Sequence, residues 1–281
     1  MTKALALTGL LLVYAMLLVP FSSYMKNRPV ALKLGYLPEA EVLRVLAADQ
    51  RYLLAQMAVD RVLFYYGSLF MQERGDKRVQ TVPEYLNMFA TLQKALKLDP
   101  YNQDAYYFAQ AAFTWELGRI KEVNNLLEYG MKYRTWDAQL PFYAGFNAAY
   151  FQKDYPKASL FMQRAAQISR NPLYTTLAAR YFYEAGQSAL GIAFLAGMEK
   201  GAKDVKIKTI YRLRREALQA TLQISQAVST YLSAYHHPPP GLAALVSSGF
   251  LKAIPPDPYG GRFYLDKDGK VRSTSKLSLK E

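Results

Sequence analysis

The residues that could carry out acid–base chemistry are few and lie far apart in the sequence. Carboxylates occur at Glu84, Glu116, Asp137 and Glu184, within segments patterned as helices. General acid–base catalysis needs a proton-transferring side chain held against the reacting group, and paired carboxylates act only when they share a site. None of these four residues forms a spacing that demands such chemistry. We therefore expect a protein that is not an enzyme, with catalysis by a pair of these carboxylates as the alternative.

Metal and cofactor chemistry also finds little material in the sequence. There are no cysteines, which excludes disulfides, thiolate metal sites and a cysteine nucleophile. The two histidines, His236 and His237, are adjacent and lack a third ligand. Residues 266–269 look like the start of a calcium loop, but Lys270 and Arg272 stand where further oxygen ligands would be needed. Phosphate- and dinucleotide-binding motifs are absent from the sequence, so we expect no cofactor and no metal.

The net charge of +13 and the pI near 9.6 favour anionic partners, with a solvated basic surface as the alternative. Cations gather around the start of a segment, 204–235, that lacks Gly and Pro and predicts one long helix. If this helix lies near a membrane, its cationic face could contact anionic lipid headgroups. The candidate contact residues are Lys206, Lys208, Arg212, Arg214 and Arg215. The chain shows no recognisable nucleic-acid-binding motif, so we expect no nucleic acid partner.

The first segment predicts a membrane anchor. Residues 4–21 form a run of eighteen residues without a charge, about the minimum that crosses a bilayer. A cleaved signal peptide is the rival interpretation, but residues 20–24 do not match a small-x-small cleavage site. We expect a single-pass anchor over residues 1–25 in a bacterial inner membrane. Cations on both sides leave the orientation open; we expect a periplasmic body, with a cytoplasmic body as the alternative.

The middle of the chain carries a repeated helical pattern. A linker and a helical cap are expected over residues 26–81, and helix pairs over residues 82–202. Turns at Gly118, Asp154 and Gly186 are spaced by 36 and 32 residues, and small residues recur late in each second helix. These small residues are Ala95, Gly130, Ala165 and Gly197.

Together with the segment FATLQKALKLDP (89–100), this pattern resembles the tetratricopeptide (TPR) repeat, whose period is 34 residues. The resemblance implies stacked helical hairpins, which bury a continuous core only when several adjoin. It also implies a concave surface that binds a peptide or a partner helix. The candidate groove residues are Tyr106, Tyr107, Asn147 and Tyr150, although aromatic residues at such spacing are commonly core.

The last segment predicts a short helix over 241–250 and a β-hairpin. Residues 262–265 and 270–273 alternate like strands, and Asp268-Gly269 between them is a strong hairpin-turn signal. The order of features over residues 222–275 resembles the globular head of the type II secretion major pseudopilin. The matching residues are Pro239, Leu242, Leu245, Leu251, Pro255, Asp257, Pro258, Tyr259, Gly260, Tyr264, Gly269 and Ser273. The pilin-type processing site and its helix are not joined to this module, so polymerisation as a pseudopilin is not expected.

These features predict a mainly α fold: an N-terminal transmembrane helix, a TPR-like α-solenoid, and a module over 203–281 with a long basic helix and a small β-hairpin. We expect a membrane-anchored scaffold or assembly factor that binds protein partners in an envelope complex, such as pilus-like or type II secretion-like machinery. An anchor raises the effective concentration of the body for partners in the same membrane. The alternative is a non-catalytic accessory subunit of a respiratory or electron-transfer membrane complex.

Overall fold

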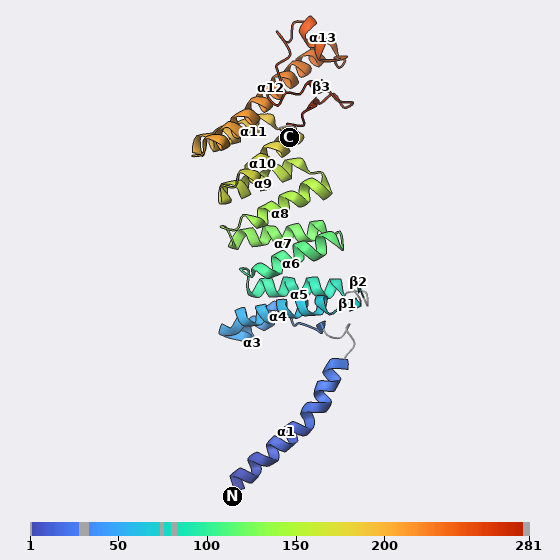
Figure 1. The fold of residues 1–281 in the computed structure, drawn as a ribbon, viewed down its shortest axis with the longest axis vertical. Helices are drawn as coiled ribbons and strands as arrows, with labels where there is room; N and C mark the ends of the chain where they lie inside the picture. The colour runs from blue at the N-terminus through green and yellow to red at the C-terminus, as the bar shows by residue number, and fades with distance from the viewer. Residues whose placement is uncertain (1, 28–33, 74–75, 80–83, 278–281) are drawn as a thin grey trace. The chain divides into compact units, whose positions relative to one another are not determined.

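The computed structural model describes residues 2–27, 34–73, 76–79 and 84–277, and it is mainly helical (Figure 1). The chain divides into two compact units, Met1–Gly118 and Arg119–Glu281. This division falls within the stretch expected to form repeats, at the predicted turn residue Gly118. Each unit is described by itself below.

The first unit begins with the apolar helix α1 (Thr2–Asn27). Its stretch Ala6–Met25 is long and apolar enough to cross a membrane, and none of it is buried. This confirms the expected N-terminal apolar helix. By length and composition, a membrane span and a signal sequence both fit.

Among its described residues, the remainder of the first unit contains four α-helices, a 3₁₀ turn and a hairpin. Its elements are α3 (Ala40–Ala47), a 3₁₀ turn η1 (Ala48–Gln50), α4 (Arg51–Gly67), β1 (Phe70–Glu73), β2 (Asp76–Val79), α5 (Tyr85–Leu98) and α6 (Gln103–Trp115). Helix α5 packs against α3, α4 and α6. The antiparallel β1–β2 hairpin was not predicted from the sequence, where a linker and a helical cap were expected over residues 26–81.

The second unit consists of consecutive helices followed by a small sheet. Its elements are α7 (Ile120–Tyr133), α8 (Gln139–Asn147), a π-helical turn η2 (Ala148–Gln152), α9 (Tyr155–Ser169), α10 (Pro172–Glu184), α11 (Ser188–Gly201), α12 (Val205–Tyr235), α13 (Leu242–Ser247), β3 (Phe263–Leu265) and β4 (Val271–Ser273). From α7 to α12, each long helix packs against the next one in the chain.

Small residues allow these helices to approach closely. A Cβ on Gly145 would lie 3.1 Å from Cε of Met162, and one on Gly191 would lie 2.8 Å from Cδ1 of Leu218. Of the small residues singled out in the sequence, Ala95, Gly130 and Ala165 are buried as expected. A Cβ on Gly197, in contrast, would meet nothing within 4 Å. Gly197 therefore does not serve helix packing, and the expectation for it was wrong.

The long helix predicted over 204–235 is present as α12. Asp204 is its N-cap and accepts hydrogen bonds from the backbone N–H of Lys206 and Ile207, at 2.7 and 3.2 Å. The predicted C-terminal hairpin is also present, with Phe263 opposite Ser273 and Leu265 opposite Val271. Its apolar side joins the far half of α12 and α13 in one core, whose members are Ala220, Ile224, Ala227, Tyr231, Leu242, Leu245, Leu251, Phe263 and Val271.

Candidate functional site

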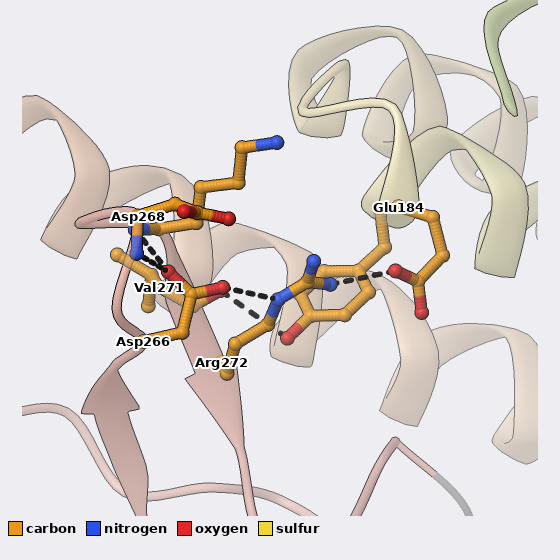
Figure 2. A network of polar contacts seen from close by, with 7 residues as sticks. Glu184, Asp266, Asp268, Val271 and Arg272 are labelled. Atoms are coloured by element: carbon orange, nitrogen blue, oxygen red, sulfur yellow. Dashed lines mark hydrogen bonds and ion pairs between the residues drawn. The ribbon is translucent and has the colours of Figure 1, made fainter. Parts of the chain in front are cut away.

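The C-terminal hairpin is attached to α10 by a polar network centred on Arg272 of β4 (Figure 2). The Nη1 of Arg272 donates to Oε2 of Glu184 at 2.6 Å, and its Nε donates to Oδ2 of Asp266 at 3.1 Å. The hydroxyl of Tyr183 donates to the carbonyl of Val271 at 3.3 Å. Residues that are 88 positions apart are thereby joined, so the hairpin is held on the helices.

The carboxylate of Asp266 holds the hairpin turn by hydrogen bonds. A calcium ion bound to this loop would have needed the same oxygens. Its Oδ1 accepts from the backbone N–H of Asp268 at 3.0 Å and of Lys270 at 2.8 Å. Desolvation acts to raise the pKa of Asp266, but the hydrogen bonds from Lys270 and Arg272 outweigh it and lower this pKa overall. Desolvation likewise opposes the charge of Arg272, while hydrogen bonds to Glu184 and Asp266 raise its pKa.

A second network is buried beneath the turn that precedes the hairpin. Oδ2 of Asp257 accepts hydrogen bonds from the hydroxyls of Ser273 and of Ser275, the latter at 2.6 Å. Oδ1 of Asp257 accepts from the N–H of Tyr259 at 2.9 Å. A Cβ on Gly261 would lie 2.5 Å from Oδ2 of Asp257 and 2.7 Å from the N of Ser275, so the network closes around this glycine.

The five candidate cations of α12 divide into two groups. Lys206, Lys208 and Arg212 are exposed, so their charges are available at the surface. Arg214 and Arg215 are instead half-buried and engaged within the chain.

The Nη2 of Arg214 donates to the carbonyl of Leu277 at 2.8 Å, and the guanidinium lies 5.8 Å from the ring centre of Tyr259. Arg215 pairs with Glu199 at 3.0 Å. These two arginines engage neighbours of α12 within the chain, so of the five candidates Lys206, Lys208 and Arg212 are the ones that stand exposed at the surface.

The four candidate groove residues are not equally accessible. Tyr106 and Asn147 are fully buried, and Asn147 donates to Oδ1 of Asn124 at 2.9 Å. Side chains without exposed surface do not line a groove, so these two were wrongly placed by their position on first helices. Tyr107 is half-buried, and Tyr150 is exposed in the π-helical turn, where it stacks on Phe146.

The candidate catalytic carboxylates hold structure together. Glu116 accepts from the hydroxyls of Tyr66 and Tyr85, and burial together with this hydrogen bond raises the pKa of Tyr85 to about 12. Asp137 pairs with Arg134 at 3.0 Å.

Glu84 and His237 also have contacts within the chain. Glu84 accepts from Nδ2 of Asn87 at 3.1 Å. The rings of Tyr231 and Tyr235 lie beside His237, at the end of α12. Among the described residues, no group of three or more His, Asp or Glu side chains is arranged to hold a metal ion.

An apolar cleft with cations at its rim was not anticipated from the sequence. It has a volume of about 700 Å³ and lies where α9 ends and α10 begins, beside the turn from α11 to α12. Its lining residues are Ala166, Gln167, Arg170, Pro172, Gly197, Met198, Gly201, Ala202, Lys203, Asp204, Ile207 and Tyr211. Gly197 was the feature of the sequence that could have indicated this cleft, but its place in the repeat pattern predicted helix packing instead.

Comparison of the chain with protein-family models, with curated proteins and with solved structures gave no match. The function is therefore argued below from the geometry of the chain itself.

Proposed function

We propose that this protein is a membrane-tethered scaffold that binds protein partners in a bacterial envelope complex and does not act as an enzyme. The observation that carries the proposal is α1, whose apolar stretch Ala6–Met25 is wholly exposed to its surroundings. Large apolar surface left in water is unfavourable, so a helix of this kind needs a bilayer or a processing step. A tether to the inner membrane satisfies this requirement and concentrates the body at the membrane.

The paired helices support a role in protein binding. Consecutive packing from α7 to α12 and close approach at Gly145 and Gly191 are the features that a TPR-like array requires. Large aromatic side chains remain exposed on the helices and their turns, among them Trp136 and Tyr150. Tyr and Trp are enriched at protein interfaces because they bury much area at little entropic cost.

The C-terminal module supports an assignment to pilus-like or type II secretion-like machinery. Its resemblance to the major pseudopilin head runs through Asp257, Tyr259 and Ser273, and these residues lie in the buried network. We propose that this module is a fixed attachment for a partner in such machinery. The hairpin cannot act as a free pilin subunit while Arg272 holds it to α10.

The test is purification of the full chain from solubilised membranes, with a tag at Glu281. We expect the protein to stay in the membrane pellet after carbonate washing and to co-purify with envelope proteins. A Trp136→Ala and Tyr150→Ala double variant should release partners, whereas Phe64→Ala, an exposed aromatic of α4, serves as the matched control.

A protein found only in the soluble fraction would contradict the tether, and a lone monomer would contradict the scaffold. Co-purification of respiratory subunits would instead support the accessory-subunit alternative. A periplasmic reporter fused after Glu281 should be active; activity of a cytoplasmic reporter alone would reverse the proposed orientation.

A further inference from the structure

The cleft at the start of α12 has the composition of a ligand site. Its volume of about 700 Å³ lies within the range that small-molecule sites occupy. Its walls come from two neighbouring core clusters that meet at Met198, one containing Ala166 and the other containing Ile207 and Tyr211. The interior is therefore an extension of the hydrophobic core that opens to the surface.

Polar groups of the cleft remain available to a ligand. Tyr211 lines the cleft and is buried, with only 2% of its surface exposed. At the rim, Arg170 and Lys203 are exposed and form no ion pair with any described residue.

Charge determines which kind of ligand the rim favours. Asp204 is the acidic residue among those lining the cleft, and its Oδ1 is occupied by the N-terminal N–H groups of α12. The exposed cations Lys200 and Lys206 flank the rim. The rim as a whole is cationic, which favours an anionic head above an apolar body.

We propose that this cleft binds an anionic phospholipid, with an acyl chain against Met198 and Ile207 and the phosphate at Arg170 and Lys203. The inference rests on the proposed membrane tether, because the tether places bilayer lipid within reach of the chain. It makes Lys203 and Arg170, rather than Arg214 and Arg215, the residues that contact lipid phosphate.

Gly197 gives a sharp test because filling the cleft should not damage the fold. A Cβ there meets nothing within 4 Å, and Gly197 lies inside α11, where leucine is the better helix former. Gly197→Leu should therefore leave the thermal midpoint unchanged or higher while occupying the space of the acyl chain. Gly201→Leu, on the same wall, is a second variant with open space around it.

The assay uses the full chain in phosphatidylcholine nanodiscs containing a phosphatidylglycerol with a photoactivatable acyl chain. We expect cross-links in residues 197–211, with α1 as the internal reference for lipid contact. Gly197→Leu should lower labelling of 197–211 about tenfold, since it displaces several methylene groups. Gly67→Leu, at an exposed position of α4 with open space, is the matched control and should change nothing.

Variants that remove charge from the rim test whether the rim binds the lipid phosphate. Arg170 has φ 54°, a left-handed conformation that asparagine tolerates, so Arg170→Asn removes charge without backbone strain. Combined with Lys203→Gln, it should lower the preference for phosphatidylglycerol over a phosphatidylcholine probe of equal chain length about tenfold. Lys208→Gln removes an exposed charge of α12 that lies outside the cleft and should have no such effect.

Three outcomes would overturn the proposal. These are unchanged labelling in a folded Gly197→Leu protein, equal labelling by both phospholipid probes, and labelling by a photoactivatable fatty acid but not by the phospholipid. The last result would assign the cleft to a free anionic amphiphile. Partner capture is measured separately, so its failure with intact cleft labelling would reject the scaffold and leave the lipid site standing.

Discussion

Replacement of Gly261 by alanine should destabilise the C-terminal module through one added methyl group. The new Cβ would lie 2.5 Å from Oδ2 of Asp257, 2.7 Å from the backbone N of Ser275 and 2.8 Å from its Cβ. Contacts below 3.0 Å require a shift of the chain, and here a backbone atom and a buried carboxylate must move. Ser275 is then displaced from its hydrogen bond to Asp257.

The magnitude follows from two contributions. Overpacking of a close-packed interior costs about 1–3 kcal/mol, and the displaced hydrogen bond of Ser275 adds about 1 kcal/mol. We expect a loss of about 3 kcal/mol in the free energy of unfolding of the second unit. For a unit of this size, each kcal/mol lowers the melting temperature by about 2–4 °C, so the shift should be about 6–12 °C.

Urea and thermal unfolding of the full chain in detergent measure this loss. Hydrogen exchange locates it: the N–H groups of Tyr259, Ser275 and Leu277 all donate to the network and should exchange faster in the variant. Gly197→Ala is the matched control, because its Cβ meets open space in a helix; it should stabilise by about 0.5–1 kcal/mol. Equal stability of Gly261→Ala and the wild type would refute the reasoning.

Four further predictions concern other polar contacts. Arg272→Met should lower the free energy of unfolding by about 1 kcal/mol, because the ion pairs of Arg272 are partly solvated. It should also speed hydrogen exchange in the hairpin. Unchanged exchange would show that Arg272 does not hold the hairpin on α10. The folded state lowers the pKa of Asp266, so this carboxylate stabilises the fold above its ordinary pKa. That stabilisation is lost as the pH falls from the ordinary pKa through the lower folded value. In an acid titration, Arg272→Met should therefore lose less free energy of unfolding than the wild type. The pKa of Tyr85 is about 12 in the folded protein, against an ordinary value of 10, so between these pH values the unfolded chain releases the proton first. The free energy of unfolding should therefore fall as the pH rises from 10 to 12. Tyr85→Phe should flatten that part of an alkaline titration. Asn147→Ala should cost about 1–3 kcal/mol in urea unfolding, since Asn124 then loses a buried partner; a neutral effect would show that water replaces the amide.

Local sequence signals predicted the elements whose formation depends on neighbouring residues. The helix predicted over 204–235 begins after Asp204 and ends before His236, because a capping carboxylate and a Pro-rich stretch act within a few residues. The strands at 262–265 and 270–273 and the turn between them were placed within one residue, since Asp268-Gly269 fixes the hairpin locally.

The candidate site was less accessible to sequence reasoning. Asn147 and Tyr150 lie three positions apart, yet one is buried against Asn124 and the other is exposed, because a π-helical turn begins directly after Asn147. Similarly, Arg214 and Lys208 belong to one cationic helix, but α10 and the C-terminal segment cover only Arg214. Helical periodicity gives the faces of a helix, and only the neighbouring helices decide which face is covered.

The sequence by itself therefore determined the apolar first helix, the predominance of helix, the long α12 and the C-terminal hairpin. These depend on hydropathy, caps and turn residues that act over a few positions. Tertiary structure alone decided that Arg272 meets Glu184, that Asp257 is buried under two serines, and that Gly197 opens a cleft instead of closing a helix contact. Such contacts join residues far apart in the chain, and their geometry arises only when helices of particular length and tilt pack together.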